Sequence, residues 1–330
     1  MSNLSNMRTL IKPYLKVHLM ALAFVLVSVG NASAVTYYSR TNNGMWKNPT
    51  TWSTVTYGNT TNTGTYPQRG DIVFIGNAYT INVDTNVVVT NLTIGQGVSG
   101  KLFFPSNTIR SITVNGNLTI NKGAQFAYAG NNTKSHSLFI SGNLINNGLL
   151  DLYSDANDLV NLTFNGKVNS TVSGTGTFDL NTVTLFKNTL TTYELNVQVS
   201  SFETAVRTLV LTYGTYVHNN TGNFQVNPFG GNFTIPVDAS VTVPVGILAL
   251  SPRNQYLYLE GKINVTGGTV TVGSTAGNGG IRYYKNGTSI AAINISSGQL
   301  SVYGGITNRI GYATDPFVLN ITGGSILCNS

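Results

Sequence analysis

The stretch from Ile112 to Phe126 constrains the fold of this chain more than any other. It places apolar residues at every second position on both sides of an Asn-Gly-Asn turn, at Ile112, Val114, Leu118 and Ile120. A period of two is typical of β-strands with one buried face. Each run has only about three residues, too few to be stable alone. Such a unit is stable only when similar units stack on it.

The chain contains further copies of this unit. Leu138–Leu152 repeats it nearly position for position, and the other copies are Ile263–Val272, Ile293–Val302 and Leu319–Ile326. Equivalent positions recur about every 24–30 residues, a period within the range of repeat architectures. These steps run from Ile112 to Leu138, from Leu138 to Leu162, from Ile293 to Leu319 and, the longest, from Ile263 to Ile293. A repeat of this length with several short strands predicts a parallel β-helix, right-handed by the base rate of crossovers.

The segment from Met1 to Ala34 is not expected to belong to this fold. Arg8, Lys12 and Lys16 form a basic start, Leu19–Val29 is a short apolar run, and Ala32–Ala34 supplies small residues for cleavage. This order is typical of a secretory signal peptide. The alternative is a membrane anchor, but the apolar run is shorter than the ~20 residues of a spanning helix. We therefore expect a secreted or outer-surface protein with no membrane span after cleavage.

Charge gives little support to nucleic-acid binding. The chain has a formal net charge of +7, but three of its 18 basic residues lie in the predicted signal peptide, which leaves 15 against 11 acidic residues. The remaining charges are scattered singly, without a basic cluster. The only cysteine is Cys328, so the chain cannot form an internal disulfide.

Two regions are expected within the mature chain. Residues 35–104 contain an aromatic-rich opening, Tyr37–Trp52, and the first coils of the solenoid. We expect Trp46 and Trp52 to pack in a cap, because an open solenoid end exposes strand edges. Residues 105–330 contain the repeats and end inside one, so either the sequence is a fragment of a longer protein or its export and anchoring differ from those of similar exported proteins. No helical period of useful length follows residue 34.

Several motifs in the first region fall in the order of a known module. They are Trp52, Pro67, Gly70–Ile75, Thr80–Asp84, Asn91–Gly95 and Leu102–Phe104. This order resembles the G8-like module that opens parallel β-helices in large secreted and surface proteins. The repeats, with Leu162–Gly166 leading to Thr171–Gly176, are similar to the β-helical proteins that Bacteroidetes-type bacteria export, many by the type IX route. The resemblance implies an exported surface β-helix.

Catalysis by a β-helix of the polysaccharide lyase or hydrolase type needs clustered carboxylates, often with Ca²⁺. The only close acidic pair is Asp155 and Asp158, which we consider as ligands of Ca²⁺ against a solvated turn. Other acids, Asp151 and Asp179 among them, are single residues at turns or strand ends, although coil stacking can bring distant acids together. His136 and His218 stand alone in polar loops, without a partner at metal-ligand spacing. We expect no cofactor other than this Ca²⁺.

Aromatic residues offer a better ligand hypothesis. Tyr283 and Tyr284 follow Arg282, and Tyr256 and Tyr258 lie about one coil earlier. These five residues are predicted to form an exposed strip on which sugar rings stack. The alternative is that the aromatic residues stack from coil to coil for stability.

The sequence favours a non-enzymatic structural or adhesive module at the cell surface that contacts glycans. Its expected partners are extracellular polysaccharide or the surface of a host or neighbouring cell. The alternative is a carbohydrate-processing lyase or hydrolase, or its accessory β-helix, with a catalytic part formed by stacking or contributed by a missing segment. Three or more carboxylates converging in one groove would favour the enzyme.

Overall fold

The computed structural model describes residues 33–61, 63–128, 134–153, 159–188, 191–226, 231–250, 255–274, 279–285, 289–309 and 315–329. The chain divides into two compact units, Met1–Ala34 and Val35–Ser330. The predicted signal peptide falls almost entirely outside the described residues. No helix in the described part of the chain is long and apolar enough to cross a bilayer.

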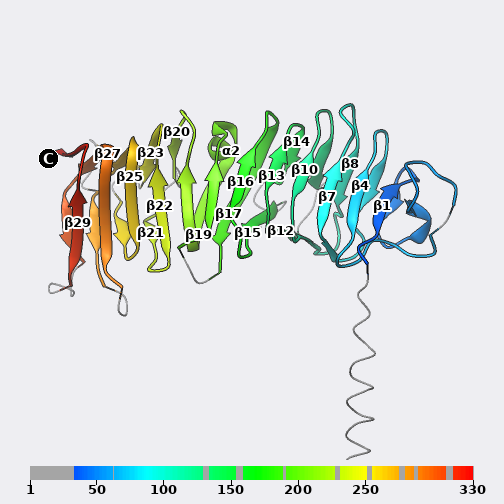
Figure 1. The fold of residues 1–330 in the computed structure, drawn as a ribbon, viewed down its shortest axis with the longest axis horizontal. Helices are drawn as coiled ribbons and strands as arrows, with labels where there is room; N and C mark the ends of the chain where they lie inside the picture. Colours follow the sequence, from blue (N-terminus) through cyan, green and yellow to red (C-terminus); the bar gives the residue numbers. More distant parts are fainter. Residues whose placement is uncertain are drawn as a thin grey trace, which may run out of the picture. The chain divides into compact units, whose positions relative to one another are not determined.

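The second unit is a β-solenoid in which short strands stack in parallel along one axis (Figure 1). Strands make up 56% of the structure and helices 3%, which confirms the predicted all-β, parallel β-helical class. Each turn contributes segments to three faces, which we call A, B and C. The right-handed sense stays a prediction.

Face A runs through the whole unit. Its strands are β1 (Thr36–Ser39), β4 (Ile72–Ile75), β7 (Asn91–Ile94), β10 (Leu118–Ile120), β13 (Leu144–Asn146), β16 (Ser170–Ser173), β18 (Glu194–Val197), the end of β19 (Val206–His218), β22 (Ala239–Val243), the start of β25 (Lys262–Val272), the start of β27 (Ala291–Tyr303) and β29 (Phe317–Ile321).

Face B consists of two ladders with a helix between them. Its segments are β2 (Gly44–Met45), β5 (Thr80–Asn82), β8 (Lys101–Phe104), β11 (Gln125–Tyr128), β14 (Leu149–Asp151), the start of β17 (Thr177–Phe186), α2 (Ser200–Ala205), β20 (Asn223–Gln225), β23 (Ile247–Leu250), the ends of β25 and β27, and β30 (Ser325–Asn329).

Face C also has two ladders. The first contains β6 (Val87–Val89), β9 (Ser111–Val114), β12 (Ser135–Ile140), β15 (Leu159–Phe164), the end of β17 and the start of β19. The second is a separate sheet of β21 (Phe233–Ile235), β24 (Leu257–Leu259), β26 (Ile281–Tyr283) and β28 (Ile306–Asn308).

The predicted equivalences between repeats are confirmed by strand register. Ile112 pairs with Leu138, and Leu138 with Leu162, on face C. Ile263 pairs with Ile293 on face A. The assumption that Ile263 is equivalent to Ile112 is wrong, because the two residues lie on different faces. The same apolar-polar alternation around a glycine turn therefore fits more than one corner of the coil.

The core consists of inward columns of apolar side chains. Leu92, Leu118 and Leu144 are in register on face A and are fully buried. Each side chain of this kind contributes about 1.5–3 kcal/mol through burial. The outward residues between them are mostly Thr and Asn, so one alternating sequence satisfies both the core and the surface.

The corners between faces are stabilised by asparagine side chains and glycines. Asn91 Oδ1 accepts a hydrogen bond from the backbone N–H of Asn117, and Asn117 Oδ1 accepts one from Asn143 one coil later. Gly123 has a φ of +75°, and a Cβ there would lie 2.1 Å from the carbonyl oxygen of Val98. Only glycine fits this conformation and this close approach.

The aromatic opening forms the predicted N-terminal cap. Trp46 and Trp52 are fully buried, with ring centroids 5.0 Å apart in an edge-to-face contact. The indole N–H of Trp52 donates to the carbonyl of Trp46 over 2.7 Å. The short strand β3 (Trp52–Ser53) pairs antiparallel with β1. Since β4 pairs with the other side of β1, β3 covers this end of face A.

One short α-helix follows residue 34 in the described part of the chain, where the sequence shows no helical period of useful length. The helix α2 packs between β17 and β20 on face B and lies near the middle of the solenoid (Figure 1). Phe202 is fully buried against Phe164 and Phe178. The helix therefore replaces one strand of the coil while keeping an apolar side chain in the core.

Candidate functional site

The structure brings four of the five predicted glycan-binding residues to the outer side of face C. Tyr258 on β24 pairs in register with Arg282 on β26, and Thr307 on β28 continues that outward column. Tyr256 precedes β24, and its backbone N–H donates to Asn232 Oδ1. Tyr284 follows β26 on the same outward side.

Guanidinium groups cover these tyrosine rings. The guanidinium carbon of Arg282 lies 3.4 Å from the ring centroid of Tyr256. That of Arg309 lies 5.2 Å from the ring of Tyr258 and 4.7 Å from the ring of Tyr284. Cation–π contacts of this kind contribute about 0.5–1 kcal/mol at exposed sites. The rings and arginines therefore hold one another in fixed positions across successive coils.

Tyr283 does not belong to this outward group. It pairs in register with Leu259, which is fully buried, and packs against the core. Its ring stacks on that of Phe317 with a centroid distance of 4.4 Å. Adjacent residues of a strand point to opposite faces, so Arg282 and Tyr283 cannot contact the same ligand.

A carboxylate completes the outward group. The Tyr284 hydroxyl donates to Glu260 Oε1, and Glu260 is largely buried. Burial, followed by this hydrogen bond, raises the pKa of Tyr284 to about 12. The phenol therefore stays protonated over the physiological range. We call Tyr256, Tyr258, Glu260, Arg282, Tyr284 and Arg309 the tyrosine–arginine surface.

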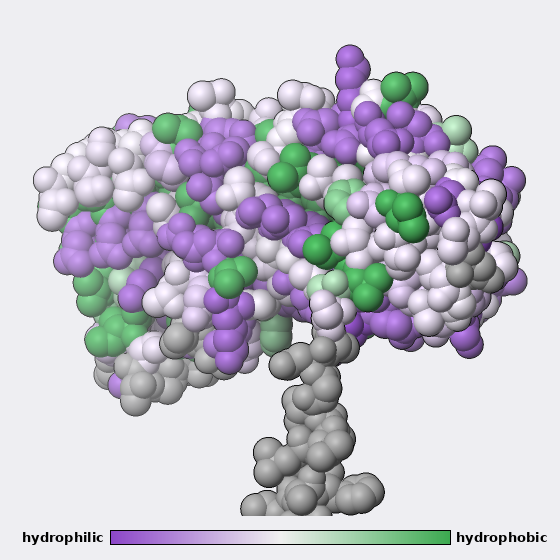
Figure 2. Space-filling view, turned by 45° about the vertical axis from the view of Figure 1, so that its right-hand side comes forward, coloured by the Kyte–Doolittle hydropathy of each residue, from purple (hydrophilic) through white to green (hydrophobic). Residues whose placement is uncertain are grey.

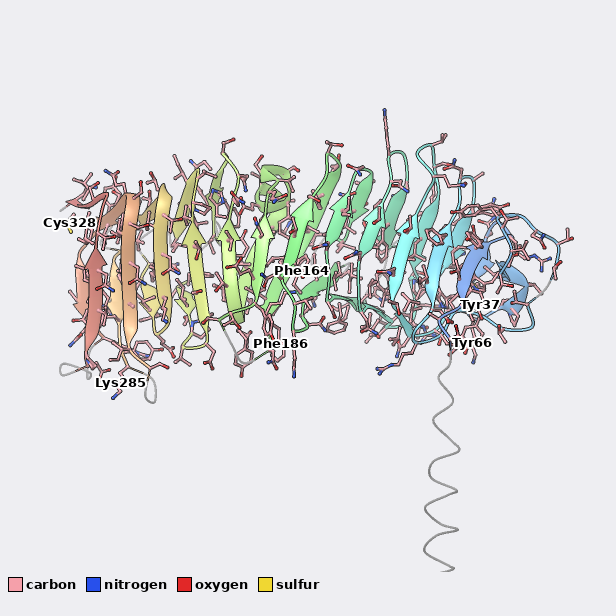
Figure 3. All side chains as sticks on the ribbon, in the orientation of Figure 1. Tyr37, Tyr66, Phe164, Phe186, Lys285 and Cys328 are labelled. Atoms are coloured by element: carbon pink, nitrogen blue, oxygen red, sulfur yellow. The ribbon has the colours of Figure 1, made fainter. Side chains whose placement is uncertain are left out.

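The tyrosine–arginine surface suits ligands that offer both apolar C–H groups and hydroxyl or acidic groups. Tyrosine rings provide apolar faces with a polar edge, and the two arginines outnumber the single carboxylate. Lys285 follows directly in the chain and points outward at the edge of the solenoid (Figure 3). Elsewhere, hydrophilic and hydrophobic residues are interspersed over the face shown in Figure 2.

Two acids treated as single residues in the sequence lie side by side. Asp151 on β14 pairs in register with Asp179 on β17. Asp179 Oδ1 accepts a hydrogen bond from Arg207 over 2.7 Å, and the Arg207 guanidinium stacks on Tyr153 at 3.5 Å. Burial, followed by the negative charge of Asp179, raises the pKa of Asp151. This pair thus combines two carboxylates in different environments.

The candidate calcium ligands Asp155 and Asp158 lie outside the described residues. Within the described ranges, no three His, Cys, Asp or Glu side chains gather closely enough to hold a metal ion. Cys328 lies on β30 (Figure 3) and is exposed.

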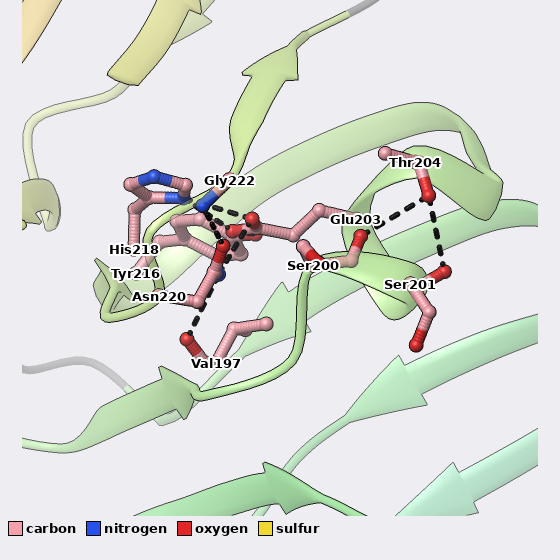
Figure 4. A network of polar contacts seen from close by, with 9 residues as sticks. All are labelled: Val197, Ser200, Ser201, Glu203, Thr204, Tyr216, His218, Asn220 and Gly222. Carbon is pink, nitrogen blue, oxygen red and sulfur yellow. Dashed lines mark hydrogen bonds and ion pairs between the residues drawn. The ribbon is translucent and has the colours of Figure 1, made fainter. Parts of the chain in front are cut away.

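A buried polar network lies inside the coil that contains α2 (Figure 4). Glu203 on α2 accepts hydrogen bonds from Tyr216 over 2.6 Å, from His218 Nδ1 over 2.8 Å and from Asn220 over 2.8 Å. Glu203 and His218 are 1% and 0% exposed. Burial, followed by the charge of Glu203, raises the pKa of Tyr216 well above its usual value. This burial indicates a structural role for the network.

His136 and His218 are therefore not loop residues, as the sequence suggested. His136 points inward on β12, stacks on Phe104 and accepts a hydrogen bond from the backbone N–H of Arg110. His218 pairs in register with Val197. His136 pairs in register with Val160 as His218 does with Val197, so each histidine adjoins an apolar residue of a neighbouring coil.

Lys187 is a second buried charged residue. Its Nζ donates to the carbonyl oxygens of Ser141, Asn165 and Val168 at 3.0–3.2 Å and to Ser170 Oγ. Burial lowers the pKa of Lys187 to about 8. The ammonium group thereby joins corners from successive coils.

Sequence reasoning missed Glu260 and Arg309, although the repeat length indicates both. Glu260 precedes Tyr284 by one coil length, and Arg309 follows Tyr284 by one coil length. Counting one coil length backward and one forward along the sequence from Tyr284 therefore identifies Glu260 and Arg309 as its neighbours.

Comparisons with known proteins do not assign this chain to a family. A scan against family models, a search of curated proteins and a search of solved structures each give no match to this chain. The resemblance to G8-like modules and to exported Bacteroidetes-type β-helices therefore stays a prediction.

Proposed function

We propose that this protein is a non-enzymatic structural or adhesive module of the cell exterior that contacts glycans. The tyrosine–arginine surface is the observation that carries this proposal. It presents tyrosine rings and guanidinium groups from consecutive coils on one outward face. Because these groups are already fixed by cation–π contacts, little side-chain entropy is lost when a sugar chain binds.

Replacing Tyr258 by alanine is expected to weaken binding to an extracellular polysaccharide about tenfold. The change removes one ring and one of the two ring contacts of Arg309, each with a contribution of about 0.5–1.5 kcal/mol. The measurement is retention of the purified full chain on a glycan array and on whole cells.

Tyr303→Ala is the matched control, because Tyr303 is a half-buried tyrosine at the end of β27 on face B, away from the tyrosine–arginine surface. It should bind as the unchanged protein does. Equal retention of Tyr258→Ala and the unchanged protein would exclude the tyrosine–arginine surface as the contact site.

A second function, cleavage of a polysaccharide, draws support from the Asp151–Asp179 pair, although this is two carboxylates and not the three or more that would favour an enzyme. Neighbouring parallel strands lie about 4.8 Å apart, close to the ~5 Å between the carboxyl groups of retaining glycosidases. Asp151, with its raised pKa, would donate a proton to the glycosidic oxygen. Asp179, paired with Arg207, would act as the ionised partner.

Release of reducing ends or unsaturated sugars from a polysaccharide panel tests this second function. If it holds, the full chain releases product and Asp151→Asn abolishes the release, whereas Asp238→Asn, at a turn elsewhere, does not. The first function predicts binding without release.

A further inference from the structure

We propose that a groove on the outer side of face A binds a neutral polysaccharide chain lying along the solenoid axis. This inference rests on the proposed glycan-contacting function but concerns a site separate from the tyrosine–arginine surface. The groove has a volume of about 630 Å³ and is formed by β25, β27 and β29. This size is typical of ligand sites.

The floor of the groove contains a ladder of amide side chains. Asn264, Asn294 and Asn320 are in register on three consecutive coils. Asn294 Nδ2 donates to Asn264 Oδ1, and Asn320 Nδ2 donates to Asn294 Oδ1, both over 2.9 Å. The amide planes are therefore held in one orientation before any ligand arrives.

Each amide in the ladder keeps hydrogen-bonding capacity for a ligand. A carboxamide has two N–H donors and two acceptor lone pairs. The ladder uses one donor and one lone pair of Asn294, which leaves one of each. Two residues after each asparagine comes a hydroxyl residue, Thr266, Ser296 or Thr322, and all three are exposed. The amides therefore repeat at steps of about 4.8 Å, whereas the hydroxyl residues leave this register, because a bulge pairs Thr266 with Ser297.

The remaining lining selects a ligand without charge. None of the residues that line the groove is acidic or basic, so neither a phosphate nor a uronic acid would find a counter-ion. Leu319 and Ile321 line the groove beside Asn320 but pair in register with the buried Ile293 and Ile295, so their side chains lie on the inward side of β29 and the uncharged amides and hydroxyls supply the ligand contacts. A neutral chain of hydroxylated rings, one ring near each coil, matches this combination.

Affinity electrophoresis of the full chain in gels containing a soluble neutral β-glucan or mannan tests this site. Retardation that added salt does not reverse is expected, together with a loss of about tenfold in apparent affinity for Asn294→Leu, which removes a ladder rung and its ligand contacts. Ser296→Ala removes one hydroxyl without touching the ladder and should lose about threefold. Thr119→Ala, on face A outside the groove, should not change the retardation.

The outcomes separate this site from the proposed function. Retardation by neutral polymers that depends on Tyr258 and not on Asn294 or Ser296 would overturn the groove while the proposed function stands. Binding of an extended peptide without any neutral polysaccharide would also overturn it. Loss with Asn294→Leu and Ser296→Ala, but not with Tyr258→Ala, would support the groove even if the tyrosine–arginine surface binds nothing.

Discussion

Glu203→Leu is expected to destabilise the solenoid by at least about 3 kcal/mol, because each buried polar partner left without its acceptor costs about 1–3 kcal/mol. The change leaves His218, Tyr216 and Asn220 buried without their shared acceptor. Urea unfolding gives the free energy, and hydrogen exchange shows where it is lost. The loss of protection should concentrate in β18, β19 and β20, because repeats of a solenoid contact mainly their neighbours.

A double variant separates the network from simple packing. Glu203→Leu combined with His218→Leu removes both members of the pair, and leucine resembles Val197 in the neighbouring position of the column. Replacement of a buried pair by apolar residues is often neutral. The double variant should therefore be more stable than Glu203→Leu alone. If its loss of stability relative to the unchanged protein equals the sum of the losses in Glu203→Leu and His218→Leu, the two residues do not act as one network.

The stability of the protein should rise with pH above about 8 relative to Lys187→Met. Burial lowers the pKa of Lys187 to about 8 in the folded chain, against 10.5 for an ordinary lysine. Between these values the unfolded chain binds more protons than the folded chain, so the free energy of unfolding increases with pH. The increase is at most about 1.4 kcal/mol per pH unit. Urea unfolding at several pH values, compared between the two proteins, measures it.

Lys167→Met is the matched control. Lys167 lies in the corner that supplies Asn165 and Val168 to Lys187, but it is exposed. Its replacement should leave the pH dependence unchanged. A constant difference between the original protein and Lys187→Met from pH 8 to 10 would show that the ammonium keeps its ordinary pKa.

The overall architecture could be predicted because each coil repeats the same local constraint. A side chain such as Leu118 must stack on Leu92 and Leu144, so apolar residues recur at one coil length and alternate within each strand. The face on which a copy lies could not be predicted in this way. Ile112 and Ile263 have similar surroundings in sequence, and only the number of residues in the intervening corners sets their different faces.

The sites were less predictable because they depend on register across coils. Tyr256, Tyr258 and Arg282 could be grouped from the repeat length, whereas the inward direction of Tyr283 follows from the strand period and was overlooked. Glu203 gave no signal, because its burial depends on a helix that replaces a strand. The burial of His218, by contrast, had a signal in the sequence. Aligning Tyr216–His218 with Leu195–Val197 places His218 in an inward column.

The turn that contains α2 has a mechanical consequence. Among the described residues, strand pairing between this turn and the next is confined to face A, where β18 pairs with the end of β19. On face B the helix interrupts the ladder, and on face C the sheet of β21 begins separately. A load applied between the two ends of the solenoid would therefore meet the fewest backbone hydrogen bonds here, and rupture under tension would begin beside Glu203.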